Sequence, residues 1–291
     1  VKNTILKYLL FIYTLIKKQC LTYNLNNMNL ENKILITGYD GYIGKYLINY
    51  LKKKKFRLKK LSLIKKNSIK FSNFTHLIHL NFYIGEKKGN LKKNLDNMNK
   101  VIKICENNNL SLIFPSTASF KYKNKNRVSK NLEVFNRYTR AKYECEKAIL
   151  LSSKKKNLKY TILRIFNVYG GDLNNRYYIS NIIKEFNRSK IFSKVYFKLY
   201  KNVRDFIHID DLSNLILKVI KQNENDIFEV GSGKSISIQN LIKKINKISK
   251  KKNQLNFIEP NNLLKIFILN HLFIKQKRPL IGCQKFLLKK V

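Results

Sequence analysis

The chain contains 291 residues, of which 60 are Lys or Arg and 17 are Asp or Glu, giving a formal net charge of +43 at pH 7. Because 44% of the residues are hydrophobic and 12% are aromatic, there is enough apolar material for a buried core, which excludes wholesale disorder. The four cysteines lie far apart and form no CxxC pair, which excludes a small disulfide-stapled scaffold.

The positive charge has two competing explanations. A charge of this size is typical of proteins that bind nucleic acid or an anionic surface. The lysines, however, are spread over nearly every segment and accompany abundant Asn, Ile, Tyr and Phe, as the codons of an AT-rich genome would produce, and we favour this second explanation. We therefore expect no specific nucleic-acid partner, although the field would still attract phosphorylated substrates.

Residues 1–30 are expected to be an N-terminal extension. Their apolar run, from Thr4 to Ile16, is interrupted by Lys7 and is shorter than the ~20 residues that span a bilayer. No signal-peptide cleavage site follows it. Met28 stands just ahead of the first strong strand signal, so we expect the native start there, with a short membrane-surface helix as the alternative. We expect no stable membrane insertion and a cytoplasmic location.

From residue 33 onward, apolar strand-like runs alternate with longer segments of helical periodicity. The expected strands are residues 33–37, 58–64, 76–80, 110–114 and 160–166, and the expected helices are 44–53, 92–107 and 136–152. This alternation predicts an α/β fold with a doubly wound, Rossmann-like parallel sheet. Because the rhythm breaks after Tyr169, we expect a main domain over residues 31–168 and a smaller α+β lobe over 169–291 that returns elements to it.

Three glycines directly after the first strand form the most specific local signal. Gly38, Gly41 and Gly44 stand in the sequence ILITGYDGYIGKYLI, where a strand would turn into a helix. The first permits a tight turn, the second lets the backbone approach a diphosphate, and the third permits close helix packing. The helix N-terminus would then face the phosphates. Glycine is scarce in this chain, so the pattern predicts a dinucleotide site.

Tyr138 and Lys142 are the candidate catalytic pair. Four residues apart on a predicted helix, they share one face, and an ammonium beside a phenol lowers a pKa that is ordinarily ~10. A tyrosine tuned in this way can take a proton from a sugar hydroxyl or return one to a ketone.

Six further motifs follow in order: HLIHLN (76–81), FPSTAS (114–119), YTRAK (138–142), LRIFNVYGG (163–171), RDFIHIDDL (204–212) and FEVGSGKSISI (228–238). With the glycine motif, they make the sequence similar to the extended short-chain dehydrogenase/reductases, the NAD-dependent epimerase/dehydratase family that acts on nucleotide sugars. The resemblance covers roughly residues 33–245 and implies NAD or NADP as cofactor.

The resemblance also assigns roles to individual residues. It implies that Tyr138 is the acid/base, that Lys142 lowers its pKa and holds the nicotinamide ribose, and that Thr117 hydrogen-bonds the reacting oxygen, with Ser116 as a substitute. The implied cofactor-binding residues are Gly38, Tyr39, Asp40, Gly41, Tyr42, Ile43, Gly44, Ser62, Asn94, Tyr138 and Lys142. The implied contacts to a nucleotide-diphosphate sugar are Ser116, Thr117, Asn167 and Arg204.

The sequence also departs from the family pattern. Ser62, followed by Lys65 and Lys66, stands where NAD-specific members carry an acidic residue, so NADP is as credible as NAD. Residues 62–75 are short for a full crossover and a third strand. Asn81 and Phe82 replace small residues that let the cofactor lie close. Ala and Ser follow Thr117 where dehydratases have an acidic pair, which disfavours dehydration.

We therefore expect a nucleotide-sugar 4-epimerase of surface-polysaccharide synthesis, acting by transient oxidation of a sugar hydroxyl. The alternatives are an NADPH-dependent 4-ketosugar reductase and a non-catalytic Rossmann-like binding protein. A homodimer through the helices at 92–107 and 136–152 is expected by resemblance. We assign no metal: Asp205, Asp210, Asp211, His76 and His79 are interpreted as structural, as is Arg164, and residues 253–291 receive no role.

Overall fold

The computed structural model describes residues 33–64, 70–85, 89–119, 136–171, 177–198, 203–222, 225–249, 251 and 253–258. The expected N-terminal extension, Lys65, Lys66 and residues 259–291 lie outside them. The chain divides into two compact units. The first holds the described residues up to Ile183 and those from Val203 to Ile236, and the second holds the described residues of 184–202 and those after 236.

A parallel sheet of six strands forms the centre of the first unit, in the order β2-β1-β3-β4-β5-β9. The strands are β1 (Lys33–Thr37), β2 (Arg57–Lys60), β3 (His76–His79), β4 (Ser111–Thr117), β5 (Tyr160–Ile165) and β9 (Asp226–Val230). Every residue of β3 and β4 is buried, because a parallel sheet is covered on both faces. The predicted doubly wound sheet is confirmed.

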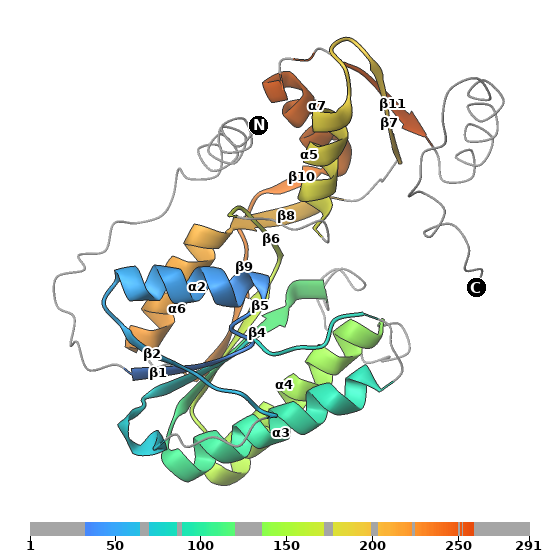
Figure 1. The fold of residues 1–291 in the computed structure, drawn as a ribbon. Coiled ribbons are helices and arrows are strands. Elements are labelled where there is room, and N and C mark those ends of the chain that lie inside the picture. Colours follow the sequence, from blue (N-terminus) through green and yellow to red (C-terminus); the bar gives the residue numbers. More distant parts are fainter. Residues whose placement is uncertain are drawn as a thin grey trace. The chain divides into compact units, whose positions relative to one another are not determined.

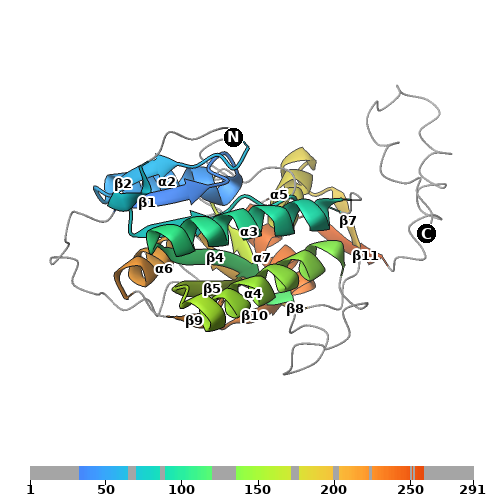
Figure 2. The same ribbon diagram turned by 90° about the horizontal axis from the view of Figure 1, so that it is seen from below.

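Two pairs of helices cover the two faces of this sheet (Figures 1 and 2). One face carries α2 (Tyr42–Lys53) and α6 (Ile209–Gln222), and the other carries α3 (Asn90–Asn108) and α4 (Arg137–Lys156). Each pair has its own core: Leu47, Leu51 and Ile216 belong to the first, and Met98 and Ile149 to the second. The helix α4 therefore reaches the sheet from the face opposite α2.

The remaining elements are shorter. A three-stranded sheet joins β6 (Asn167–Tyr169), β8 (Val203–His208) and β10 (Ser235–Ser237), and a 3-10 turn spans Phe71–Asn73. In the second unit β7 (Lys194–Lys198) pairs in parallel with β11 (Gln254–Ile258) and α7 (Ile238–Ser249) is amphipathic. The helix α5 (Tyr178–Arg188) crosses the boundary between the units.

The strand β2 differs from its prediction. It ends at Lys60 rather than at residue 64, and the described part of the segment before β3 holds only the 3-10 turn. Among the described residues the sheet therefore ends at β2, with Arg57, Lys59 and Lys60 exposed. Such cations discourage pairing of an open sheet edge with another chain.

Candidate functional site

The site begins where the strand order reverses. The chain runs from β1 outward to β2 and returns to the other side of β1 as β3, so the carboxyl ends of β1 and β3 flank a topological switch point. Ligands of open α/β sheets bind in the crevice at such a point. The glycine sequence follows β1 directly, and Leu80 and Asn81 follow β3. The two candidate segments are thereby neighbours.

The glycine turn is locked against the end of β3. Gly38 has φ +65°, and a Cβ built on it would lie 2.3 Å from the carbonyl carbon of Leu80 and 2.4 Å from the amide nitrogen of Asn81. A Cβ on Gly44 would lie 2.3 Å from the Gly38 carbonyl oxygen, so the first turn of α2 packs on the same loop. Gly38 therefore provides both the predicted tight turn and a close approach of two strand ends, and Gly44 provides the predicted helix packing.

The first turn of α2 is suited to an anion. Gly41 is the exposed N-cap, and no side chain caps the helix. Unpaired backbone N–H groups at a helix start attract phosphate through hydrogen bonds and the helix dipole. A Cβ on Gly41 would meet only the Gly38 carbonyl oxygen, at 3.3 Å. Asp40 is also exposed, whereas Tyr42 donates a hydrogen bond of 2.6 Å to the Gly170 carbonyl.

The end of β2 presents a cation that the sequence did not single out. The Lys60 ammonium lies 4.9 Å from the centroid of the Tyr39 ring, on the glycine turn. Ser62, the expected ribose contact, is partly buried, and its hydroxyl accepts a bond of 3.4 Å from the Ile64 N–H. Lys60 escaped notice because β2 was expected to continue beyond it.

Tyr138 and Lys142 lie on α4, which begins at a well-formed cap. The Asn136 carboxamide accepts a hydrogen bond of 2.8 Å from the Thr139 N–H, fixing the start of the helix just before the pair. The Lys142 ammonium donates to the Pro115 carbonyl at 2.6 Å. The dyad is thus tied to β4, two residues before Thr117.

Two aromatic rings enclose the Lys142 ammonium. Nζ lies 3.8 Å from the Phe82 ring centroid and 4.4 Å from that of Phe114. Phe82 also meets the Tyr138 ring edge-on, with centroids 5.6 Å apart. The structure therefore brings Tyr138, Lys142 and Phe82 together in one contact cluster.

The electrostatics of the dyad differ from the expectation. Burial lowers the pKa of Lys142 to about 7, with Cys145 and Glu146 opposing the shift. The pKa of Tyr138 is raised to about 12, first by burial and then by Tyr177. The expected lowering of the Tyr138 pKa by Lys142 is wrong for this arrangement, because desolvation outweighs any help from an ammonium that is itself shielded by aromatic rings.

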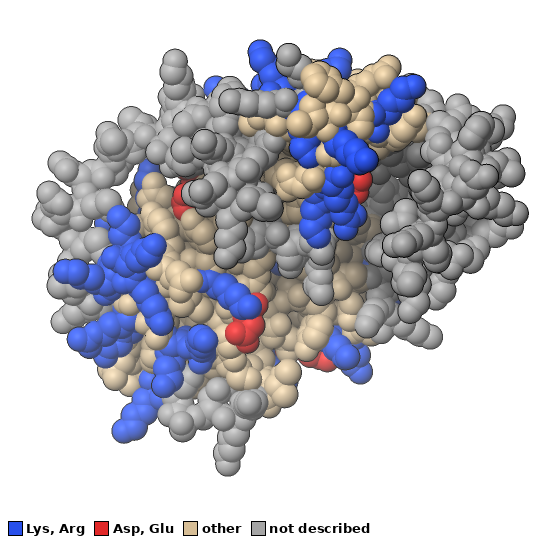
Figure 3. Space-filling model, turned by 45° about the horizontal axis from the view of Figure 1, so that its top comes forward, with Lys and Arg blue, Asp and Glu red and all other residues tan. Residues whose placement is uncertain are grey.

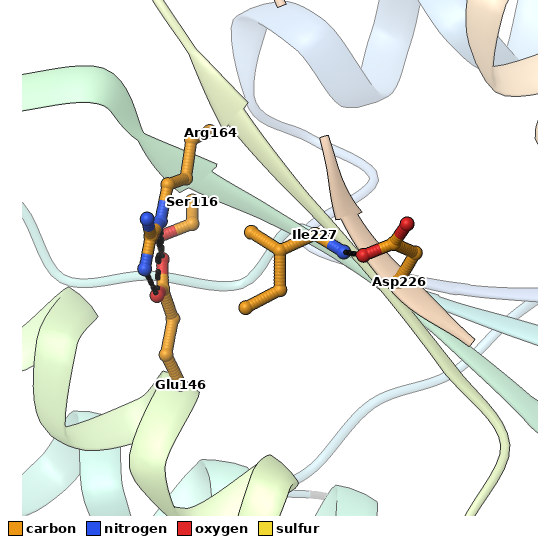
Figure 4. Close-up of polar contacts among 5 residues, drawn as sticks. All are labelled: Ser116, Glu146, Arg164, Asp226 and Ile227. Atoms are coloured by element: carbon orange, nitrogen blue, oxygen red, sulfur yellow. Dashed lines mark hydrogen bonds and ion pairs between the residues drawn. The ribbon is translucent and has the colours of Figure 1, made fainter. Parts of the chain in front are cut away.

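A buried ion pair fixes α4 to the sheet one turn beyond Lys142 (Figure 4). The Arg164 guanidinium of β5 donates through Nε and Nη2 to Glu146 at 3.1 and 2.7 Å, and Ser116 donates to the same carboxylate at 2.5 Å. The side chain of Glu146 is 2% exposed. This confirms Arg164 as structural. It also commits the Ser116 hydroxyl to Glu146, which leaves Thr117, bonded to Ser119 at 2.9 Å, as the hydroxyl candidate.

Asn94 holds the loop after β3. Its side chain accepts from the Tyr83 N–H at 2.9 Å and donates to the Tyr83 carbonyl at 3.1 Å. Both ends of the amide are therefore occupied by one backbone unit, and Asn94 is buried. Asn94 thereby positions the segment that contains Phe82, and its predicted contact with the cofactor stays a prediction.

The expected substrate contacts lie on neighbouring strands. Asn167 of β6 donates to the Asp205 carbonyl at 2.8 Å, and Arg204 is partly exposed on β8. The Asp205 carboxylate accepts from the N–H groups of Ser232 and Gly233, at 2.8 and 2.9 Å, so it fastens a loop to β8. Asp205 is therefore structural, as expected.

The strand histidines are structural too. His79 is 1% exposed, its Nδ1 lies 2.7 Å from Thr37 Oγ1, and burial, reinforced by Lys142, lowers its pKa to about 3. Burial also lowers the pKa of His76, to about 4. In the described part of the chain no three His, Cys, Asp or Glu residues gather as metal ligands would. None of the described helices is long and apolar enough to cross a membrane.

A glycine turn at the switch point of a parallel sheet, with a Tyr-x-x-x-Lys helix beside it, defines a dinucleotide-binding domain of the short-chain dehydrogenase/reductase class. The model of the NAD dependent epimerase/dehydratase family matches residues 67–231, more than half of the sequence. The chain belongs to this family. No curated protein sequence matches it.

Solved structures of such enzymes share the fold. A UDP-N-acetylglucosamine 4-epimerase from Bacillus cereus is 21% identical to this chain, with a TM-score of 0.63. The match covers 78% of this chain and 88% of the epimerase chain. A UDP-N-acetylglucosamine 4-epimerase from Methanobrevibacter ruminantium M1 is 20% identical with a TM-score of 0.65, covering 79% and 86%. A GDP-mannoheptose C4 reductase from Campylobacter jejuni, with NADP bound, is 17% identical with a TM-score of 0.64, covering 80% and 89%.

Proposed function

We propose that this chain is an NAD(P)-dependent nucleotide-sugar 4-epimerase that transiently oxidises a sugar hydroxyl. The observation that carries the proposal is the convergence of two elements 100 residues apart. The glycine turn is locked against Leu80 and Asn81, and the next residue, Phe82, contacts both Tyr138 and Lys142. The family and the epimerases and reductases that share the fold support a nucleotide sugar as the substrate.

The chain's residues fit the diphosphate of a dinucleotide. The uncapped N–H groups at the start of α2 would bind the phosphates beside Gly41, where the cradle is open. When bound, NAD or NADP supplies a hydride acceptor and donor. Figure 3 shows exposed lysines and arginines in several groups on the described part of one face, and these cations would attract such anionic ligands to the surface.

Three side chains would handle the proton. Tyr138 would take the proton from the sugar hydroxyl through its phenolic oxygen and later return it, as a general base and then a general acid. Lys142 would hold the ribose of the dinucleotide. Thr117, at the end of β4, would hydrogen-bond the reacting oxygen.

Two other side chains would bind the nucleotide sugar. Arg204 would bind the nucleotide diphosphate through its planar guanidinium, and Asn167 would contact the same ligand.

A 4-ketosugar reductase is the second candidate, because of the charge beside the glycine turn. Lys60 lies over Tyr39, and residues 57–64 contain no acidic side chain that would bind both hydroxyls of an adenosine ribose. A cation at this position favours the extra phosphate of NADP. NADPH is the dinucleotide that reductases consume.

The two activities are separated by their need for added cofactor. The purified chain is incubated with UDP-N-acetylglucosamine, UDP-glucose or a GDP-4-ketosugar, and products are separated by chromatography. We expect an epimer to form without added NADPH, whereas a reductase would consume NADPH and ketosugar in equal amounts. Tyr138→Phe should abolish either reaction, and Tyr143→Phe, on the same helix, should retain it. No conversion and no dinucleotide binding would leave a non-catalytic binding protein.

The homodimer expected by resemblance also remains a proposal. The helices α3 and α4 contact each other on one face of the sheet (Figure 2), and Leu151 of α4 is 54% exposed. Light scattering of the purified chain, with Leu151→Lys as the disrupting variant, tests whether these helices meet a second copy.

A further inference from the structure

The Lys142 side chain, which would hold the ribose of a dinucleotide, is covered by aromatic rings in this structure. An ammonium has three N–H donors, and one of them is used by the Pro115 carbonyl. Among the described residues, no second hydrogen-bond acceptor contacts Nζ, whose other neighbours are the rings of Phe82 and Phe114. Among the described residues, the remaining N–H groups of Nζ therefore have aromatic rings and no polar acceptor beside them. A diol such as that of a ribose would satisfy both.

Only one of the two rings is able to give way. Phe114 lies inside β4 and is fully buried in the core, at 0% exposed. Phe82 is only partly buried and follows the carboxyl end of β3, on the side of the switch point. Access to Lys142 therefore depends on the position of the Phe82 ring.

The backbone on both sides of Phe82 is held in place. The Asn81 N–H donates to Thr37 Oγ1 at 3.3 Å, and the Asn94 side chain bonds to both the backbone N–H and the backbone carbonyl of Tyr83. The locked contact between Gly38 and the Leu80–Asn81 peptide lies just before it. A movement that exposes Lys142 must therefore be a rotation of the Phe82 side chain and not a shift of the loop.

We propose that Phe82 is a gate residue: its ring covers Lys142 beside Tyr138 and must turn away before a dinucleotide can place its ribose there. The inference rests on the proposed function, since it concerns the same site. Closing the gate reduces the fraction of chains that are competent to bind, and the apparent affinity falls by that fraction.

The test measures the binding of NADPH and NAD to the full-length chain by calorimetry and stopped-flow fluorescence. Opening the gate breaks a desolvated cation–π contact and an aromatic edge contact, so we expect Phe82→Ala to bind the dinucleotide about tenfold more tightly, equivalent to about 1.4 kcal/mol. The gain should appear in the association rate. Phe82→Leu, which keeps an apolar side chain but loses the π face, should shift in the same direction and guards against misfolding of the alanine variant.

Phe74→Ala provides the matched control, because Phe74 is partly buried and packs against the same core cluster as Phe82. Its affinity for the dinucleotide should equal that of the wild type. Labelling of amines, located by peptide mass spectrometry, should also modify Lys142 faster in Phe82→Ala, and bound dinucleotide should protect it.

The outcomes separate the gate from the proposed function. Equal or weaker binding by both Phe82 variants would overturn the gate while the proposed function stands. If neither the wild type nor the variants bind any dinucleotide, the proposed function fails and the gate fails with it.

Discussion

Replacing Gly38 with alanine tests two reasons for a glycine at this position: its positive φ angle and its close contact with the backbone of Leu80 and Asn81. At φ +65° a side chain costs roughly 1–2 kcal/mol, partly offset by the lower entropy of the unfolded alanine chain. The added Cβ would also lie 2.3–2.5 Å from three backbone atoms of Leu80 and Asn81. Because these are backbone atoms of a clamped segment, relief requires the β3 end to move, at a cost of about 2 kcal/mol. We expect Gly38→Ala to lose about 3 kcal/mol.

Gly233→Ala isolates the conformational part of that loss. Gly233 has φ +73° and no atom within 4 Å of a built Cβ, so its alanine variant should lose only about 1 kcal/mol. Urea unfolding followed by circular dichroism gives both free energies of unfolding on one scale. If the two variants differ by less than about 0.5 kcal/mol, the close approach of the glycine turn to β3 contributes nothing and our account of this contact is refuted.

Two further predictions concern the helix α4. Glu146→Gln should lower the free energy of unfolding by about 3 kcal/mol, because it leaves Arg164 partly buried beside a neutral amide. Glu185→Gln is the control, since Glu185 and Arg188 form an exposed pair at 3.9 Å. In the same urea titration it should change the free energy of unfolding by less than about 0.5 kcal/mol. The second prediction concerns Lys142, whose pKa is about 7 in the folded protein against 10.5 in the unfolded chain. Between these pH values the unfolded state binds more protons than the folded state. The free energy of unfolding should therefore rise with pH from about 7 to 10.5, by up to about 5 kcal/mol. The rise is read as the difference between the wild type and Lys142→Met, which cancels the titration of other lysines, and an identical slope in both proteins would contradict the shift.

Most of the fold could be predicted from local sequence patterns. The strand KILIT and the glycine spacing that follows it locate β1 and the start of α2, because tight turns and helix packing depend on residues within one short stretch. The alternation up to β5 was correct for the same reason. The length of β2 was not, because the place where a strand stops depends on its partner β1 rather than on its own apolar run.

The interior of the candidate site was less predictable. The sequence marked Phe82 as a large residue in a small residue's place, but the rings around Lys142 come from segments 60 and 28 residues away along the chain. Contacts at this separation leave no periodic trace. For the same reason the sequence suggested a lowered pKa for Tyr138, from its spacing to Lys142, and could not show that burial dominates both groups.

Phe82 links the two ends of the site, and this bears on the choice between the two proposed reactions. Gly38 is locked against Leu80 and Asn81, and the next residue along the chain, Phe82, contacts Lys142. An epimerase regenerates its cofactor in every turnover and benefits from holding it. A reductase must release the oxidised dinucleotide each time, which a ring that closes over Lys142 would promote. A faster dinucleotide exchange in the wild type than in Phe82→Ala would therefore move the proposed function from the 4-epimerase to the reductase.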